Sequence, residues 1–375
     1  MKKLGFGLMR LPLLNADDPK SIDRQAVCRM ADLFLERGFG YFDTAYPYHD
    51  GLSEVVFREA VVKRHPRGSY TITDKLPLYL LQSEAQMEPI FRQQLERLGL
   101  DCIDYYWLHN VGTASYATAG QLGAFEFLCE KKEQGQVRHI GFSFHDRADL
   151  LDRVLTEHPE MEFVQLQLNY LDWEDANIQA RLCYETAVRH GKQILVMEPV
   201  KGGTLASLPE EEMALLRRHR PDLSAAGWAL LFAASREQVM TVLSGMSDER
   251  QMKENLRVVE EQPPLTGEEE QTLLQVAEHL RTKIAIPCTA CRYCVAGCPK
   301  HIAIPDYFSL YNNLRRFGPQ QRDNVGAYYE NLTQTHGKAS DCVGCGACEA
   351  HCPQHLSIRN YLKQTADALE RNLDF

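Results

Sequence analysis

The stretch Asp43-Thr44-Ala45-Tyr46-Pro47-Tyr48 decides the fold, because it follows the short apolar run Gly40-Tyr41-Phe42 and carries a carboxylate and a phenol. Two later apolar runs end in the same way, at Lys75 and at His109. Each run predicts a buried strand that is followed by a helix. Polar side chains at the C-terminal ends of parallel strands are typical of the catalytic rim of a (β/α)8 barrel. We therefore expect Asp43, Tyr48, Lys75 and His109 to form a proton-transfer site.

The alternation of predicted strands and helices continues to about residue 280, and eight such strands indicate a closed α/β TIM barrel. A doubly wound open sheet is the alternative, but no Gly-x-Gly-x-x-Gly follows the first strand. Residues 110–120 match no pattern, and we interpret them as a loop that contributes to substrate specificity. The predicted strands cover residues 4–9, 40–42, 70–75, 103–109, 137–144, 163–168, 194–197 and 240–243. The predicted helices cover 23–36, 53–63, 83–98 (with Ser83 and Gln86 as a capping box), 122–133, 147–156, 177–189, both sides of Pro221, 249–259 and 266–280.

Length and charge limit the kinds of partner. A chain of 375 residues predicts one large domain and a smaller one. The net charge is −10 and no basic stripe is present, so we expect no nucleic-acid partner. Met1-Lys2-Lys3 faintly resembles the start of a signal peptide, but Arg10 interrupts the apolar run that follows. No later stretch is apolar enough to span a membrane. We therefore expect a cytoplasmic protein that does not bind membranes.

Eight of the twelve cysteines lie in two similar runs, each of which ends in Cys-Pro. The spacing Cys-x2-Cys-x2-Cys-x3-Cys-Pro is that of bacterial two-cluster ferredoxins, in which the fourth cysteine binds the other cluster. Zinc is the alternative, but it favours separated pairs of ligands. We expect one 4Fe–4S cluster on Cys288, Cys291, Cys294 and Cys352, and a second on Cys298, Cys342, Cys345 and Cys348.

A domain boundary is predicted at Ile284–Pro287. Residues 1–283 would form the barrel, and residues 284–375 an α-helical ferredoxin-like domain with both clusters. Between the two cysteine runs, residues 299–341 are interpreted as an insertion that is helical in part.

The first 280 residues resemble the aldo-keto reductases, and the remainder resembles a bacterial-type ferredoxin. Asp43-Thr44-Ala45 followed by Tyr48 looks like the signature of that family, and Lys75 and His109 match its other two catalytic residues. The resemblance implies a small carbonyl or alcohol substrate. Tyr48 would protonate the carbonyl oxygen while hydride arrives at carbon, and His109 would orient the carbonyl. Lys75, held by Asp43, would lower the pKa of Tyr48.

The resemblance also implies a nicotinamide cofactor, with some departures. Ser143 and Gln165 match residues that hold the carboxamide, but Phe144-His145 stands where the family has Asn, and Met197 stands where it has a stacking ring. Ser247 replaces an Arg that pairs with the 2′-phosphate, so NAD and NADP both stay open, with Arg250 as a candidate substitute. A Ser-capped surface helix is the alternative for the dinucleotide-like segment, which comprises Ser244, Gly245, Met246, Gln251, Glu254 and Asn255.

Lys201-Gly202 follows the seventh predicted strand. Loops at this place in barrels often bind phosphate, so both residues are candidate cofactor ligands. An ordinary glycine turn is the alternative.

Three functions remain open, because iron–sulfur clusters move single electrons whereas nicotinamide moves a hydride. The first is a carbonyl reductase that uses NADP or NAD. The second is a cluster-coupled reductase with a flavin, or with a one-electron donor such as ferredoxin. The third is a non-enzymatic electron carrier or redox sensor on a decayed barrel. The four rim residues favour an enzyme, whereas Phe144 and Met197 support the second function. We expect the first function, an oxidoreductase with a possible redox partner.

Overall fold

Eight parallel strands close into a barrel in the computed structural model, which describes residues 2–15, 18–175, 178–317 and 322–370. The strands pair in sequence order, and β8 pairs with β1 through Leu4 and Val242. This closure confirms the predicted (β/α)8 fold. The strands are β1 (Leu4–Gly7), β2 (Tyr41–Asp43), β3 (Thr71–Pro77), β4 (Ile103–Val111), β5 (Val137–Phe144), β6 (Phe163–Gln167), β7 (Gln193–Met197) and β8 (Val239–Ser244).

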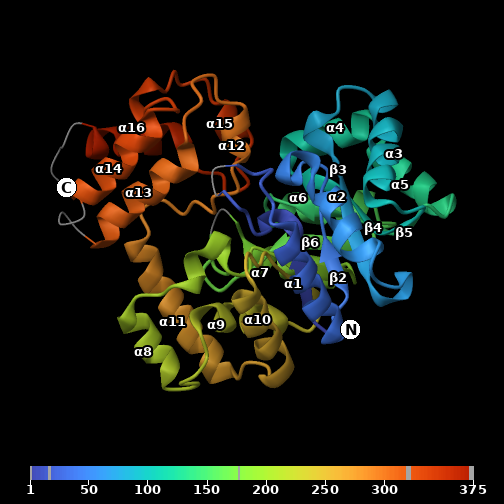
Figure 1. Cartoon of the computed structure of the whole chain (residues 1–375), viewed down its shortest axis with the longest axis horizontal. Coiled ribbons are helices and arrows are strands. Elements are labelled where there is room, and N and C mark those ends of the chain that lie inside the picture. Colours follow the sequence, from blue (N-terminus) through green and yellow to red (C-terminus); the bar gives the residue numbers. More distant parts are fainter. Residues whose placement is uncertain (1, 16–17, 176–177, 318–321, 371–375) are drawn as a thin grey trace. The chain divides into compact units, whose positions relative to one another are not determined.

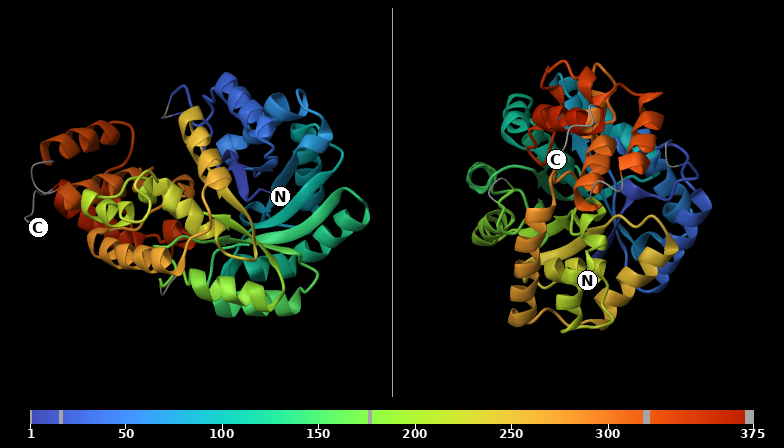
Figure 2. Two further views of the ribbon diagram at one scale, coloured as in Figure 1. Left: turned by 90° about the horizontal axis from the view of Figure 1, so that it is seen from below. Right: turned by 90° about the vertical axis from the view of Figure 1, so that its left-hand side faces the viewer.

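Helices surround the barrel, and the last of them packs beside the first. Figures 1 and 2 show helix α10, in yellow, next to helix α1, in blue. Asp23 caps α1 by accepting a hydrogen bond from the N–H of Ala26, and Asp248 caps α10 in the same way. The helices are α1 (Arg24–Glu36), α2 (Ser53–Phe57, continued by a π turn over Arg58–Val62), α3 (Met87–Leu98), α4 (Thr113–Gln121), α5 (Ala124–Glu133), α6 (Ala148–Glu157), α7 (Ala180–Arg189), α9 (Ala225–Ala234) and α10 (Glu249–Glu261).

Large side chains fill the inside of the barrel. Trp107 is fully buried. A Cβ added to Gly141 would stand only 2.6 Å from the nearest carbon of the Trp107 ring. Only glycine therefore fits at position 141. The rest of this cluster comprises Tyr41, Tyr105, Phe163, Leu195 and Leu243. The barrel is thus a packed core, and chemistry is left to its rim.

Three elements differ from the predictions. Strand β3 continues to Pro77 and strand β4 to Val111, so Lys75 and His109 lie inside their strands rather than at the strand ends. The predicted loop at 110–120 is wrong, because α4 occupies most of it. The cap of α4 comes from a distant residue: Asp146 accepts hydrogen bonds from the N–H and hydroxyl of Thr113. The predicted start of α7 at Asn177 lies outside the described residues.

The chain divides into two compact units. The first combines residues 1–200 with 217–270 and contains the barrel. The second combines residues 201–216 with 271–375. Its buried core includes Ile302, Tyr307, Phe308 and Leu362, and α13 packs against both α14 and α16 (Figure 1). The helices here are α8 (Glu210–Arg217), most of α11 (Gly267–Lys283), α12 (Tyr293–Ala296), α13 (Ile304–Phe317), α14 (Arg322–Thr333), α15 (Ala347–Ala350) and α16 (Ile358–Leu369).

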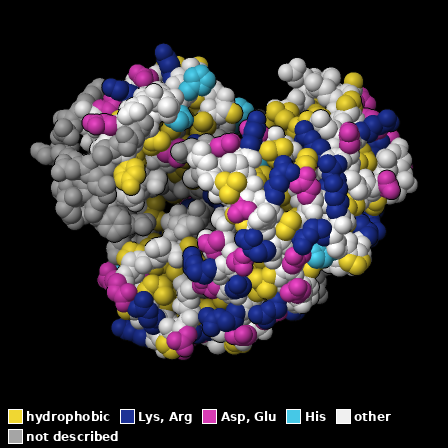
Figure 3. Space-filling model, viewed as in Figure 1, with side chains coloured by type: hydrophobic (Ala, Val, Ile, Leu, Met, Phe, Trp, Pro, Cys, Tyr) yellow, Lys and Arg dark blue, Asp and Glu magenta, His cyan; other side chains and the backbone are white. Residues whose placement is uncertain are grey.

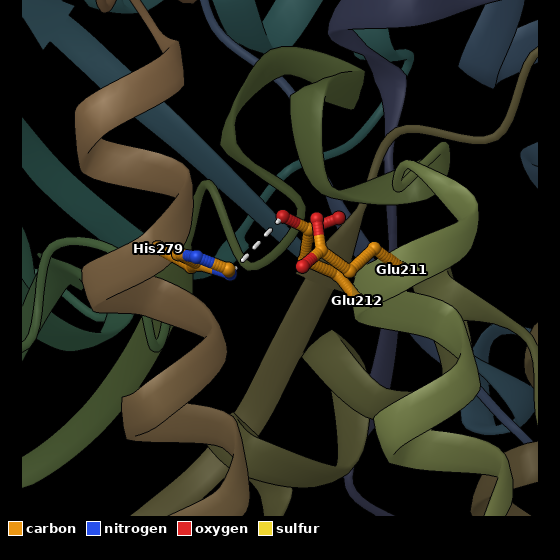
Figure 4. Close-up of side chains that lie close together, drawn as sticks. All are labelled: Glu211, Glu212 and His279. Atoms are coloured by element: carbon orange, nitrogen blue, oxygen red, sulfur yellow. Dashed lines mark ion pairs between the residues drawn. The ribbon is translucent and has the colours of Figure 1, made fainter.

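Residues 201–216 follow β7 in the chain but belong to the second unit. A 3₁₀ segment (Lys201–Ala206) begins this stretch, and α8 follows. The buried carboxylate of Glu212 lies 3.7 Å from His279 of α11, and Figure 4 shows Glu211 beside them. This contact ties α8 to α11 within the unit. The boundary predicted at residues 283/284 stays a prediction.

The visible surface carries charges of both signs. Figure 3 shows Lys and Arg side chains interspersed with Asp and Glu on the face of the barrel unit. Among the described residues, no helix has the length and apolar composition needed to cross a bilayer.

Candidate functional site

A buried ion pair forms the centre of the barrel rim. The Lys75 ammonium lies 2.7 Å from Asp43 Oδ1 and also donates to the carbonyl oxygen of Thr44, at 2.7 Å. The same nitrogen lies 3.4 Å from the hydroxyl of Tyr48. Asp43 ends β2 and pairs in register with Thr73 of β3, two residues before Lys75. Parallel pairing of neighbouring strands therefore brings the acid, the amine and the phenol together.

His109 completes the group predicted from the sequence. Its ring is buried, and it packs edge-on against Tyr48 with 6.1 Å between the ring centroids. Burial, with the positive charge of Lys75, lowers the pKa of His109 well below its ordinary value. The imidazole is therefore neutral near pH 7, and it can act as a hydrogen-bonding group rather than as a cation.

The pKa of Tyr48 differs in direction from the prediction. Burial raises the pKa of Tyr48 well above its ordinary value, and the negative charge of Asp43 raises it further. The sequence predicted that Lys75 would lower this pKa. Asp43 lies against the same ammonium and neutralises much of its field, so the effect of burial prevails. The phenol is consequently protonated at neutral pH.

A hydrogen-bonded layer behind the rim fixes Lys75. Gln94 donates to the carbonyl oxygen of Lys75 at 3.0 Å and accepts from the hydroxyl of Tyr106 at 2.6 Å. Asp74 accepts from the Lys75 N–H at 2.8 Å. Burial raises the pKa of Asp74 to about 6, while its hydrogen bond with Glu54 opposes the rise. Because these groups hold the backbone, the direction of the Lys75 side chain is set before any substrate binds.

Tyr79 is a residue of this rim that sequence reasoning missed. Its ring lies edge-on to His109, with 5.9 Å between the centroids, and 37% of its surface is exposed. It belongs to a short 3₁₀ turn (Leu78–Leu80) just after β3. A phenol four residues beyond Lys75 was the only signal in the sequence.

Ser143 and Gln165 lie side by side on β5 and β6, where they are register partners. Both are buried. The hydroxyl of Ser143 accepts from the N–H of Asn110 at 2.8 Å, and the amide of Gln165 donates to Asp43 at 3.2 Å. A hydroxyl next to an amide fits a planar carboxamide, because together they offer both donors and acceptors.

The side chains of the dinucleotide-like segment after β8 form hydrogen bonds mainly with other residues of the same segment. Asn255 donates to the hydroxyl of Ser244 at 3.0 Å, and Gln251 accepts from the N–H of Ser247 at 2.9 Å. Because Asp248 caps the N-terminus of α10, a carboxylate already lies where a phosphate would bind. Met246 is buried, a Cβ on Gly245 would meet the Arg10 side chain at 3.2 Å, and Glu254 lies 3.9 Å from Arg250.

Lys201 and Gly202 lie in the second unit. Lys201 is buried and its ammonium lies 3.2 Å from Gln354 Oε1. A Cβ on Gly202 would stand 2.2 Å from the carbonyl oxygen of Thr289. The contacted residues, Thr289 and Gln354, lie in or next to the cysteine runs. These contacts therefore do not favour the predicted phosphate contact.

The eight clustered cysteines line two separate cavities. Both cavities lie in the second unit and combine cysteines from both runs. The structure thus brings together the two predicted sets, although their roles as ligands stay predictions. The first cavity contains Cys288, Cys291, Cys294 and Cys352, and the second contains Cys298, Cys342, Cys345 and Cys348.

The donor chemistry of both cavities fits a 4Fe–4S cluster. Four thiols face each cavity, which is the ligand number that such a cluster requires. The apolar side chains of Ile304 and Phe308 line the first cavity, and Leu362 lines the second. Burial raises the pKa of Cys288 and of Cys348 to about 11, so these thiols are not poised to act as free nucleophiles.

Comparison with known proteins finds one family model that matches the barrel and another that matches the cysteine runs. The family model "Aldo/keto reductase family" matches residues 3–278, and the model "4Fe-4S dicluster domain" matches residues 287–356. The chain belongs to the aldo/keto reductase family. It is an oxidoreductase that carries an iron–sulfur domain.

Similar proteins support this family assignment. An aldo-keto reductase from Mycolicibacterium vanbaalenii is 29% identical over 226 residues, which are 60% of this chain and 74% of the relative. L-galactose dehydrogenase from Arabidopsis thaliana is 26% identical over 300 residues, which are 73% of this chain and 88% of the relative. The non-enzymatic alternative is therefore set aside.

Solved structures show the same barrel. The holo form of an aldo-keto reductase from Bacillus halodurans has a TM-score of 0.59 at 28% identity, and the match covers 73% of this chain and 91% of that one. An aldo/keto reductase from Klebsiella pneumoniae in complex with NADP and acetate also has a TM-score of 0.59, at 18% identity and with the same coverage. At that identity the second likeness shows the fold alone. In this aldo/keto reductase, Asp43 and Lys75 lie within the residues that the family model matches.

Proposed function

We propose that the barrel reduces a small carbonyl compound with NADPH or NADH, or oxidises the corresponding alcohol. The observation that carries the proposal is the Lys75 ammonium, which lies 2.7 Å from Asp43 and 3.4 Å from the Tyr48 hydroxyl. A positioned phenol beside a fixed cation is suited to donate a proton and then to stay charged. The family assignment supports a carbonyl as the substrate.

Tyr48 is the proposed acid. It is protonated at neutral pH because burial raises its pKa. In the reduction, the carbonyl carbon gains a hydride with two electrons and the oxygen takes the proton of Tyr48. The phenolate left behind is stabilised by Lys75, and His109, neutral and next to Tyr48, orients the carbonyl oxygen.

Ser143 and Gln165 are the proposed carboxamide ligands. When bound, the nicotinamide supplies the hydride. The two residues would hold its carboxamide, and Gln165 already donates a hydrogen bond to Asp43 at 3.2 Å. No relative described above names a flavin, and we do not propose one.

The two cavities are proposed to hold 4Fe–4S clusters that exchange electrons with a ferredoxin-like partner. When bound, these clusters supply one-electron transfer. The residues that would hold them are the two sets of four cysteines, since each set surrounds its own cavity. Iron and acid-labile sulfide in anaerobic protein, at about eight each per chain, would be the expected content. Zinc without sulfide would contradict it.

The test is a titration of anaerobic holoprotein with NADPH and NADH, followed by turnover with a panel of small aldehydes and ketones. We expect nucleotide binding and carbonyl-dependent oxidation of at least one nucleotide. Binding of neither nucleotide at millimolar concentration, together with rapid reduction by reduced viologen, would favour the cluster-coupled alternative. A yellow, flavin-like spectrum after removal of the clusters would favour it too.

A further inference from the structure

A buried lysine lies next to the first cysteine cavity. Lys201 is only 3% exposed, and its ammonium lies 3.2 Å from Oε1 of Gln354. Gln354 follows Cys352 by two residues and lines the same cavity as that cysteine. The Lys201 ammonium therefore lies next to Gln354, a residue of the cavity wall.

The backbone fixes this lysine in place. Gly202 has a φ of +62°, and any larger residue there would collide with the carbonyl group of Thr289. Thr289 lies between the first two cysteines of the first run. Lys201 itself has a φ of +45°, which a non-glycine residue adopts at a cost. The loop is thus packed directly against the backbone of the cysteine run.

The charged side chains that line the two cavities are exposed, in contrast to Lys201, which lies next to Gln354. Arg292 borders the first cavity, is 53% exposed and pairs with Asp306 at 3.0 Å. At the second cavity, Arg359 is half exposed and pairs with Glu349 at 2.8 Å. Lys300 also borders the second cavity and is exposed. Solvent screens such charges much more than it screens a buried one.

The position of Lys201 places a positive charge next to the first cavity. Its ammonium lies 3.2 Å from Gln354, which lines that cavity, and the adjacent Gly202 packs against Thr289 of the first cysteine run. A positive charge held there would stabilise an added electron on a cluster bound in the cavity. The potential of an iron–sulfur cluster depends on just such surrounding charge and solvent exposure.

We propose that Lys201 raises the reduction potential of the cluster in the first cavity, so that a single electron rests there in preference to the second cavity. Reduction adds one negative charge to the cluster, and a buried ammonium interacts with it in a medium of low dielectric constant. Lys201 is then a residue that orders the two clusters along an electron path. This inference rests on the proposed binding of two 4Fe–4S clusters.

The experiment is a potentiometric titration of anaerobic holoprotein, followed by electron paramagnetic resonance. In Lys201→Met, the potential of the first cluster should fall by about 59 mV, which is a tenfold change in the one-electron equilibrium constant. Lys201→Arg keeps the charge and should stay near the wild type. Lys300→Met is the matched control, because it removes an exposed lysine at the second cavity. Cys345→Ser, which removes a thiol of the second cavity, identifies which signal belongs to the first.

Two results would overturn the proposal: unchanged potentials in Lys201→Met with full iron and sulfide, or equal shifts in Lys201→Arg and Lys201→Met. If Lys201→Met loses its first cluster, the wild type still provides a test. A buried charge is screened little, so added salt should move the first potential less than the second. The opposite order would contradict the proposal. Absence of sulfide in the wild type would instead mean that the proposed cluster binding had failed.

Discussion

The barrel rim and the two cysteine cavities gather their reactive groups in opposite ways. At the rim, Lys75 and Asp43 lie 32 residues apart and meet because neighbouring strands pair. In each cavity, three cysteines come from a stretch of seven residues, and only the fourth is distant. The rim is therefore held by a scaffold that exists without its ligand. The cavities should depend more on what they bind, because a bound metal group contributes free energy to the folding of its own site.

This contrast predicts its largest effect at a buried cysteine. Cys294→Ser should remove the first cluster, so that iron falls from about eight to about four per chain. Cys183→Ser is the matched control, since Cys183 is also buried but belongs to α7 of the barrel unit and lines neither cavity. Metal and sulfide analysis measures the difference. Full iron in Cys294→Ser would show that this thiol is not a ligand.

Removal of the rim lysine tests the scaffold itself. Lys75→Met leaves the buried carboxylate of Asp43 without its cation, and we expect a loss of about 3–5 kcal/mol in the free energy of unfolding. All three tryptophans lie in the barrel unit, so their fluorescence in urea reports that unit.

The double variant Asp43→Asn, Lys75→Met is the control for this charge effect. It should recover part of the lost stability, because no unpaired charge is then buried. Equal stability of the single variant and the wild type would show that the pair is not important for folding.

Loss of the proposed proton donor should lower turnover without disturbing the barrel or the clusters. Tyr48→Phe should lower the turnover number by on the order of a hundredfold or more, with iron content and nucleotide binding unchanged. Tyr46→Phe is the matched control, because the Tyr46 hydroxyl bonds only to the exposed side of α3 through Gln93. Steady-state kinetics with NADPH or NADH gives the comparison. Normal turnover in Tyr48→Phe would remove the phenol from the mechanism.

The smallest effect concerns pH. Because burial raises the pKa of Tyr48, its acid form is present below that raised value and is lost only above it. Carbonyl reduction should therefore change by no more than about threefold between pH 7 and pH 9. Alcohol oxidation needs the phenolate and should rise across the same range. A loss of reduction with a midpoint below pH 9 would mean that Lys75 lowers the pKa after all.

The sequence predicted what depends on strand order and on local spacing. The barrel, its rim residues and the two sets of cysteines follow from such patterns. It failed where distant residues decide: Asp146 caps α4, and burial, with the charge of Asp43, raises the pKa of Tyr48. The neighbours of Lys201 could not be predicted either, because Gln354 is 153 residues away. Tyr79 has no pattern around it, and its place beside His109 follows from how far β3 extends.

The placement of residues 201–216 has a consequence for synthesis on the ribosome. Lys201 leaves the exit tunnel 153 residues ahead of Gln354. At roughly 5–20 residues per second, the wait is on the order of ten seconds. During that interval Lys201 lacks its final neighbour Gln354, and for the first part of it the apolar face of α8 also lacks α11. The polypeptide must therefore fold around a temporarily unsatisfied stretch, which is a natural place for a chaperone to act.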